Sequence, residues 1–248
     1  MKNNIQEFEE IIKEIKSKGF LRTNRVGNTG IGKTLEDYCK IPENNHQNAD
    51  FKGIEIKSQR EFTGSHLTLF TKSPTFPRSA NKFLRLNYGS FDTEYPEMKV
   101  LHTSVFANKF NTHISGYGFS ASVDYKNEKI FLLVKKLCTN QIVAQDTYWS
   151  FASIKKKIED KLNVLAYISA KTCIRDGYEY FHFDKATLLE GLSFNNFIAL
   201  LEQGKVMIDL RVGVYKTGIN AGKNHDHGTA FRVAKSDLKY FFNDIREI

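Results

Sequence analysis

The chain has 248 residues, 41% of them hydrophobic and 26% charged, which is typical of a globular protein and excludes a disordered or low-complexity chain. No apolar run approaches the roughly 20 residues of a membrane span, and the first residues, MKNNIQEFEE, lack the regions of a signal peptide, so an intracellular protein is expected. Three widely spaced cysteines indicate neither a disulfide framework nor a zinc site, whereas the net charge of +8 favours a polyanionic partner such as nucleic acid.

The first predicted element is an amphipathic helix that ends near Gly19. Its apolar residues recur at helical spacing, and they are Ile5, Phe8, Ile11, Ile12 and Ile15. Next comes GNTGIGKT, residues 27–34, which satisfies the pattern G-x-x-x-x-G-K-[ST] of phosphate-binding loops. A second, shorter helix is expected over residues 32–40, with Pro42 as its stop.

The context of GNTGIGKT argues against a nucleotide site. A phosphate-binding loop follows a buried parallel strand, which reads as a nearly continuous apolar run, but the residues before Gly27 are FLRTNRV. Pro42 cuts the following helix short, and the best second carboxylate for a metal, Asp209, is followed by a basic strand. We therefore interpret these glycines as a turn, after which a helix carries the carboxylate of Glu36.

The segment DFKGIEIK, which begins at Asp50, carries two carboxylates and a lysine in the pattern D-x4-E-x-K. In an extended strand, Glu55 and Lys57 point to one face, about 6.6 Å apart. Ile54 and Ile56 then point to the opposite face and into the core. Asp50 and Glu55 can share a hard divalent cation, and Lys57 can orient and polarise an attacking water. The alternative is an edge strand with a solvated charged face.

Two tracts of the chain lack acidic residues. The first covers residues 62–91 and the second covers residues 212–225. Their basic residues are Lys72, Arg78, Lys82, Arg85, Lys216 and Lys223. Such tracts favour surfaces that face phosphates, with an ordinary solvated surface as the alternative.

Mixed secondary structure is predicted for the rest of the chain. Strands are expected over residues 51–58, 66–71, 98–106, 119–125, 129–136, 163–170 and 205–215. Helices are expected over residues 150–162 and 194–203, the second opened by Ser193, and a last helix is opened by Ser236. Because the order is mixed rather than strictly alternating, the sequence predicts an α+β fold with a mixed β-sheet flanked by helices.

The stretch from Asp209 to Arg232 supplies side chains that suit base recognition. Arginine fits guanine in the major groove, and Asn, Asp or His complete the donor and acceptor pattern. Asp209 and Arg211 are expected to share one strand face, with Arg232 on the return strand. The loop between these strands is expected to hold His225, Asp226 and His227. A zinc site at the H-x-H pair and a plain exposed hairpin are the alternatives.

The segment NADFKGIEIKS, preceded by GIGKTLE, resembles the active-site region of the PD-(D/E)xK nucleases, in particular their MutH-like branch and, within it, the MvaI/BcnI restriction endonucleases. The similarity covers residues 30–58, and Ala49 stands where a proline usually precedes the first aspartate. The resemblance implies that Lys57 is the catalytic lysine and Glu36 an additional catalytic carboxylate. Its implied metal ligands are Asp50, Glu55 and Ile56. The implied cofactor is Mg²⁺, with Mn²⁺ as a substitute and Ca²⁺ supporting binding without cleavage.

The resemblance also implies double-stranded DNA as the partner, with base recognition largely in the C-terminal lobe and with residues 62–91 contacting the backbone or minor groove. The expected DNA-binding residues are Asp209, Arg211, Tyr215, Lys216, Asn220, His225, Asp226, His227, Arg232, Arg60, Lys72, Arg78, Lys82 and Arg85. A restriction-endonuclease-like fold is expected, with a catalytic lobe over residues 1–145 and a recognition lobe over residues 146–248 that together enclose a DNA-binding cleft.

The sequence and this resemblance together predict a Mg²⁺-dependent type II restriction endonuclease. The resemblance implies a cytoplasmic prokaryotic enzyme that neither binds a membrane nor requires a protein partner. It implies a monomer that cuts the two strands in separate events at CCWGG. Two rival hypotheses are a MutH-like nicking endonuclease of mismatch repair, which needs a partner protein, and a non-catalytic DNA-binding module in which the acidic cluster is structural.

Overall fold

The computed structural model describes residues 2–41 and 49–248, so the expected stop at Pro42 lies outside the described residues. Contacts divide the chain into two compact units. Unit 1 comprises Met1–Ser65, Ile158–Ser193 and Phe242–Ile248, and unit 2 comprises His66–Lys157 and Phe194–Phe241. This division differs from the expected boundary between residues 145 and 146, because strands that are far apart in sequence pair in one sheet.

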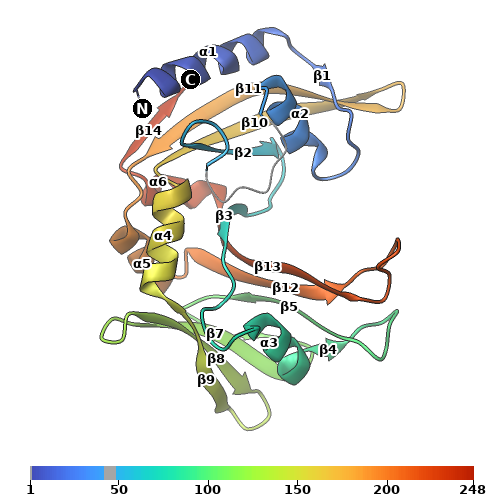
Figure 1. The fold of residues 1–248 in the computed structure, drawn as a ribbon, viewed down its shortest axis with the longest axis vertical. Helices are drawn as coiled ribbons and strands as arrows, with labels where there is room; N and C mark the ends of the chain where they lie inside the picture. The colour runs from blue at the N-terminus through green and yellow to red at the C-terminus, as the bar shows by residue number, and fades with distance from the viewer. Residues whose placement is uncertain (1, 42–48) are drawn as a thin grey trace. The chain divides into compact units, whose positions relative to one another are not determined.

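Unit 1 is built on a mixed five-stranded sheet in the order β1-β11-β10-β2, with β14 paired to β11 (Figure 1). Only β10 and β2 pair in parallel, and the other pairs of this sheet are antiparallel. The elements are α1 (Lys2–Ser17), β1 (Leu21–Arg22), α2 (Gly30–Tyr38), β2 (Ile54–Arg60), β10 (Val164–Arg175), β11 (Tyr178–Glu190) and β14 (Asp244–Glu247).

The core of unit 1 lies between this sheet and the two helices. The apolar face of α1 contributes Ile5, Phe8, Ile12 and Ile15, as its helical spacing predicts. Residues of α2 and of the strands complete the same core, among them Ile31, Leu35, Ile54, Ile56, Phe181 and Phe183. Both helices therefore cover one face of the sheet, and alternate residues of β2 point to the other face.

Unit 2 contains two antiparallel sheets, one ordered β3-β13-β12-β5-β4 and the other β6-β7-β8-β9. The strands are β3 (Leu67–Thr71), β4 (Ser90–Phe91), β5 (Lys99–Val105), β6 (Asn111–Thr112), β7 (Tyr117–Asp124), β8 (Lys129–Lys136), β9 (Gln141–Ser150), β12 (Val206–Val214) and β13 (Asn224–Val233). The helices are α3 (Ala80–Tyr88), α5 (Phe194–Glu202), the 3-10 turn η1 (Lys235–Asp237) and α6 (Leu238–Phe241). The boundary between the units falls within α4 (Phe151–Lys161).

Aromatic rings form the centre of unit 2. Phe70 of β3 stacks on Phe231 of β13 with centroids 4.9 Å apart, and Trp149 meets Phe231 edge-on at 5.8 Å. The indole of Trp149 is fully buried and donates a 2.8 Å hydrogen bond to the carbonyl of Lys72, so its polar atom has a partner inside the core.

The structure confirms the predicted α+β class with a mixed sheet. The sequence analysis missed α3, β9, β11 and β14, and also the two-residue strands β1, β4 and β6. In β11, Asp184 and Lys185 interrupt the apolar alternation that would have indicated a strand. The strand expected over residues 51–58 begins only at Ile54. None of the helices in the described part of the chain combines the length and the apolar character that a membrane span needs.

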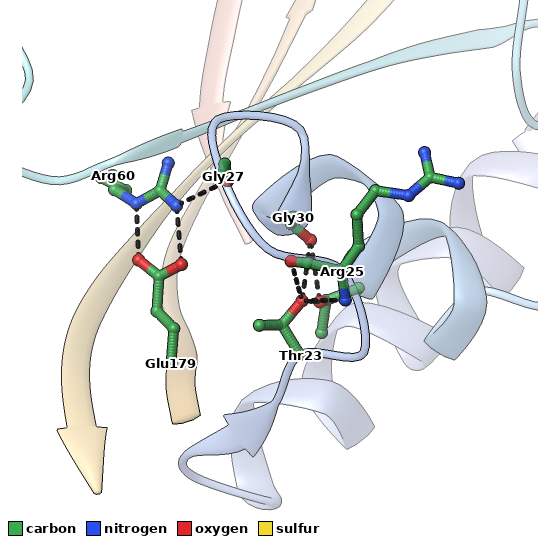
Figure 2. A network of polar contacts seen from close by, with 7 residues as sticks. Thr23, Arg25, Gly27, Gly30, Arg60 and Glu179 are labelled. Carbon is green, nitrogen blue, oxygen red and sulfur yellow. Dashed lines mark hydrogen bonds and ion pairs between the residues drawn. The ribbon is translucent and has the colours of Figure 1, made fainter. Parts of the chain in front are cut away.

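A hydrogen-bonded network around Thr23 shapes the loop that contains GNTGIGKT, as Figure 2 shows. Oγ1 of the buried Thr23 donates to the carbonyl of Arg25 at 3.0 Å and accepts from its N–H at 3.2 Å. The hydroxyl of Thr34 lies 2.8 Å from both Oγ1 of Thr23 and the carbonyl of Gly30. The loop is therefore closed by its own side chains and backbone.

The surroundings of GNTGIGKT differ from those of a phosphate-binding loop, and the absence of nucleotide binding stays a prediction. The preceding strand, β1, has two residues and pairs antiparallel with β11, whereas a phosphate-binding loop follows a buried parallel strand. The ammonium of Lys33 lies 2.8 Å from a carboxylate oxygen of Asp37, and the hydroxyl of Thr34 is buried. The two side chains that bind phosphate and Mg²⁺ in a phosphate-binding loop therefore contact other groups of the protein in this structure.

We expect Gly30→Ala to destabilise unit 1 and Gly32→Ala not to do so. A Cβ at Gly30 would lie 2.3 Å from the backbone oxygen of Arg25, whereas a Cβ at Gly32 would meet only Oγ of Ser58 at 3.9 Å. Gly30→Ala should cost about 1–3 kcal/mol of unfolding free energy through overpacking. Gly32→Ala should be neutral or stabilising by up to about 1 kcal/mol through helix propensity. Urea unfolding midpoints measure both, and equal midpoints would contradict the role of Gly30.

Candidate functional site

A tight turn before β2 brings Asp50 beside this strand. Lys52 and Gly53 have φ angles of 44° and 95°, and two backbone hydrogen bonds of 2.9 and 2.7 Å close the turn. Positive φ at both central residues is typical of a type I′ turn and favours glycine at the second. The chain therefore reverses, and Oδ2 of Asp50 accepts a 2.9 Å hydrogen bond from the backbone N–H of Ile56.

The carboxylate of Glu55 is buried between two lysines. Ile54 and Ile56 pack in the core on one face of β2, and Glu55 points to the opposite face with 1% of its side chain exposed. Nζ of Lys57 lies 2.5 Å from Oε1 of Glu55. Nζ of Lys161, the last residue of α4, lies 3.4 Å from Oε1 and 3.3 Å from Oε2. The predicted alternation along β2 and the shared face of Glu55 and Lys57 are thus confirmed.

The donor atoms at this site suit a hard divalent cation. Carboxylate oxygens are the ligands that Mg²⁺ prefers, and the bond from Ile56 to Asp50 holds the first carboxylate beside the strand that bears Glu55. Within residues 2–41 and 49–248, no three His, Cys, Asp or Glu side chains converge where a metal could bind. Glu36 is half-buried on α2, and its role as an additional catalytic carboxylate stays a prediction. Two carboxylates leave room for water and phosphate on an octahedral ion.

Arg60 at the end of β2 joins the sheet to the GNTGIGKT loop (Figure 2). Its Nε and Nη2 each donate a 2.8 Å hydrogen bond to the carboxylate of Glu179, and Nη2 also donates to the carbonyl of Gly27 at 3.2 Å. This bidentate pair fixes the plane of the guanidinium. Arg60 thus holds the loop against the sheet, and its contact with DNA stays a prediction.

In unit 2, a second buried carboxylate is shared by two arginines. Asp209 of β12 is 0% exposed, and Nε of Arg211 donates to both of its oxygens at 2.8 and 2.9 Å. Nε of Arg232, on β13, lies 3.0 Å from Oδ2 as an ion pair without hydrogen-bond geometry. The predicted shared face of Asp209 and Arg211 and the place of Arg232 on the return strand are confirmed. Among the described residues, the terminal Nη groups of Arg211 have no hydrogen-bond partner, and 45% of this side chain is exposed.

The expected position of His225, Asp226 and His227 in a loop is wrong, because all three lie within β13. The ladder between β12 and β13 continues to the pair of Val214 and Asn224, so the connecting loop covers only residues 215–223. The ring of Tyr215 stacks on His225 with centroids 3.8 Å apart, and the ring of His227 lies 3.6 Å from that of His225. No third zinc ligand joins the two histidines among the described residues.

A buried asparagine orients Asp226. Nδ2 of Asn81, on α3, lies 3.1 and 3.0 Å from the two carboxylate oxygens of Asp226, and the N–H of Gly228 donates to Oδ1 at 2.8 Å. Asn81 is itself fixed, because Oγ1 of Thr229 donates to its carbonyl oxygen at 3.1 Å. This carboxylate therefore has a defined direction on the surface of β13.

Two histidines near Arg211 favour the neutral form. Burial lowers the pKa of His102, on β5, and the positive charge of Arg211 lowers it further. Burial also lowers the pKa of His227, together with the neighbouring His225. Since the ordinary pKa of histidine is near 6.5, both imidazoles are neutral at pH 7 and each offers one donor and one acceptor.

The basic residues of the first acid-free tract differ in exposure. Arg78 and Lys82 are exposed and Lys72 is half-buried, so their contact with DNA stays a prediction. Arg85 is 4% exposed and its Nη1 donates to the carbonyl of Lys99 at 2.8 Å, so the structure does not support its predicted contact with DNA. Burial lowers the pKa of its guanidinium. Arg85 therefore takes part in the interior hydrogen bonding of unit 2.

Two residues of the loop after β12 have partners in unit 2. Nζ of Lys216 lies 2.5 Å from Oδ1 of Asp92 and 3.4 Å from Glu94, and the hydrogen bond to Asp92 raises the pKa of Lys216. Oδ1 of Asn220 accepts a 3.3 Å hydrogen bond from Lys223. DNA contacts of Lys216 and Asn220 stay predictions.

The sequence analysis missed four residues that hold these sites together: Lys161, Glu179, Asn81 and His102. For Lys161 a signal was available, since it lies at the end of a predicted helix directly before the predicted strand over residues 163–170. Nothing local distinguished the other three from ordinary polar residues.

Comparisons with known proteins agree with this geometry. The model of the MvaI/BcnI restriction endonuclease family matches residues 9–242. The structure is similar to that of restriction endonuclease MvaI in complex with its cognate DNA substrate, with a TM-score of 0.93 and 36% identity, over 100% of this chain and 99% of that chain. It is also similar to MvaI in the absence of DNA, with a TM-score of 0.64 and 34% identity, over 100% of this chain and 98% of that chain. A comparison with curated proteins finds no match.

This chain matches the family over nearly its whole length. In unit 1, Asp50 is hydrogen-bonded to β2, which carries Glu55 and Lys57, and in unit 2 a hairpin carries Arg211 and Arg232. The chain belongs to the MvaI/BcnI restriction endonuclease family and is a type II site-specific deoxyribonuclease.

Proposed function

We propose that this restriction endonuclease hydrolyses double-stranded DNA at CCWGG, as a monomer and with Mg²⁺. The observation that carries the proposal is the arrangement on β2, where Asp50 contacts the N–H of Ile56 and Glu55 contacts Lys57. Metal-assisted phosphodiester hydrolysis needs carboxylates that bind the metal and a group that orients the attacking water. The two carboxylates and the lysine at β2 can supply these groups. The substrate follows from the likeness to MvaI, whose solved complex contains its cognate DNA.

In this proposal Asp50 and Glu55 hold the metal, and the carbonyl of Ile56 completes the protein ligands. When bound, Mg²⁺ supplies a water of lowered pKa and neutralises negative charge that builds on the phosphate. Lys57 orients the attacking water, because its ammonium already lies on the face of β2 that bears Glu55. The attacking water loses a proton to solvent as its oxygen bonds to phosphorus. The bond from phosphorus to one sugar oxygen breaks, and that oxygen takes up a proton and leaves as a hydroxyl group.

The buried Asp209 supports the proposed base recognition. Its contacts with Nε of Arg211 and Arg232 fix both side chains, whereas a free arginine would lose several rotamers on binding. The terminal Nη groups of an arginine held in this way can donate two parallel hydrogen bonds to O6 and N7 of guanine. Asp226, oriented by Asn81, and the neutral His227 are suited to donors and acceptors of neighbouring bases.

Supercoiled plasmids distinguish this proposal from its rivals. We expect a plasmid with one CCWGG site to become linear in Mg²⁺ and to stay supercoiled in EDTA, while a plasmid in which CCSGG replaces that site stays intact. A nicked circle as the final product would favour a MutH-like nicking enzyme, and no cleavage in Mg²⁺ would favour a non-catalytic DNA-binding protein. Sequencing of the ends from digested genomic DNA checks the target.

We expect Asp50→Ala and Glu55→Ala to abolish cleavage and to leave DNA binding in place. Each change removes a metal ligand and no group that we assign to base recognition, so the loss falls on the chemical step. Lys57→Ala should behave similarly, whereas Glu36→Ala should reduce the rate less, since an outer carboxylate can tune the site without being required. Single-turnover cleavage rates, with binding measured in Ca²⁺, test this. Cleavage near the wild-type rate by either aspartate or glutamate variant would refute the site.

We expect Arg211→Ala and Arg232→Ala to cost about 1–3 kcal/mol on the cognate duplex and much less on a scrambled duplex, because each removes a bidentate guanine contact. Lys72→Ala and Lys82→Ala are the matched controls. If these lysines contact phosphates, their loss weakens binding to all sequences alike and reduces the salt slope by about one each. Titrations in Ca²⁺ at several salt concentrations separate the two classes. Equal losses on both duplexes for the arginine variants would make the hairpin a phosphate clamp only.

A further inference from the structure

Lys161 is a second lysine at the carboxylate of Glu55, and the fold brings it there from a distant part of the chain. It ends α4, three residues before β10 begins, and β10 pairs in parallel with β2 so that Leu165 lies opposite Glu55. The two residues are 106 positions apart in sequence. Within the described residues, Glu55 is the one acidic partner of the Lys161 ammonium.

The two lysines hold Glu55 with unequal strength. The Lys57 ammonium lies 2.5 Å from Oε1, which is a short charged hydrogen bond. The Lys161 ammonium lies 3.3 and 3.4 Å from the two oxygens, beyond the 2.7–2.9 Å that is usual for such bonds. Lys161 is therefore the looser and more exchangeable of the two partners.

The formal charges of Asp50, Glu55, Lys57 and Lys161 balance one another. The carboxylates of Asp50 and Glu55 carry two negative charges, and the ammonium groups of Lys57 and Lys161 carry two positive charges. A divalent cation that binds Glu55 must compete with both lysines and leaves a surplus of positive charge. A DNA phosphate is the anion that can take up this surplus, because it accepts a hydrogen bond from a displaced lysine.

We propose that Lys161 makes metal binding depend on DNA. In the DNA-free protein its ammonium occupies Glu55 and weakens the binding of a divalent cation. When DNA binds, the ammonium passes to a backbone phosphate and releases Glu55 to the metal. This inference rests on the proposed function, since it requires Glu55 to be a metal ligand.

A merely structural role for Lys161 predicts the opposite result. If Lys161 only held Glu55 in place, its removal would loosen the carboxylate and weaken metal binding. If Lys161 competes with the metal, its removal strengthens metal binding in the absence of DNA. One unit charge about 4–6 Å from a divalent cation changes the affinity for that cation by a factor of about ten to thirty in water without salt. Screening at about 0.1 M ionic strength reduces this factor to about three to ten.

The experiment measures Ca²⁺ binding to the full chain by calorimetry without DNA, and the affinity for a cognate duplex by fluorescence anisotropy over a range of Ca²⁺ concentrations. We expect Lys161→Met and Lys161→Gln to bind Ca²⁺ about three to ten times more tightly than the wild type without DNA. The factor by which Ca²⁺ strengthens DNA binding should fall correspondingly, since the coupling between two ligands is reciprocal. Lys161→Arg should keep the coupling of the wild type within about twofold.

Lys18→Met is the matched control, because it also removes a lysine that pairs with a glutamate in unit 1. Nζ of Lys18 lies 2.6 Å from Glu14 on the exposed side of α1, and this variant should leave both measurements unchanged. Unchanged or weaker Ca²⁺ binding by both neutral Lys161 variants would overturn the inference, as would an unchanged coupling factor. Glu55→Gln tests the metal site separately: wild-type Ca²⁺ binding in that variant would refute the metal site itself, and this inference with it.

Discussion

The burial of Glu55 is the constraint on which unit 1 depends. A carboxylate removed from water costs several kcal/mol unless it is paired, so a side chain that is 1% exposed requires cationic partners. One partner, Lys57, comes from the same strand face two residues on, and the other, Lys161, comes from the end of α4. Parallel pairing of β10 with β2 is what brings that helix end to the carboxylate.

Unit 2 also contains a buried carboxylate between two cationic side chains, but there the cations are arginines. Asp209 is 0% exposed, is paired two residues on along its own strand with Arg211, and receives a second cation, Arg232, from the neighbouring strand. In both units the two-residue period of a strand places acid and base on one face. Lysines are compact charges with labile protons and suit hydrolysis, whereas arginines present a planar fork and suit guanine.

The segment GNTGIGKT satisfies a local pattern, but its side chains have partners within the protein. In a phosphate-binding loop, the lysine, the hydroxyl and the backbone N–H groups face the ligand. Here Lys33 pairs with Asp37, Thr34 contacts Thr23 and Gly30, and Arg60 bonds the carbonyl of Gly27. The glycine at position 30 is required because the Arg25 carbonyl occupies the space of a side chain, which is a packing reason and not a catalytic one.

The sequence by itself determined the features that follow from the periodicity of one helix or one strand. The core face of α1, the alternation along β2 and the shared face of Glu55 and Lys57 follow from helical and strand geometry within a few residues. The family resemblance then supplied the activity, because the acidic pair and the lysine lie in one short segment.

Only the tertiary structure decided which distant residues complete these sites. It showed that a turn folds Asp50 back onto β2, that His225 belongs to a strand, and that Arg85 is buried. It also showed that Lys161 contacts Glu55, 106 positions away in sequence, and that Asn81 contacts Asp226, 145 positions away. The physical reason is that the burial of a side chain and its ion-pair partners depend on the order of the strands and on segments far apart in sequence. A local pattern of residues indicates neither the strand order nor these distant partners.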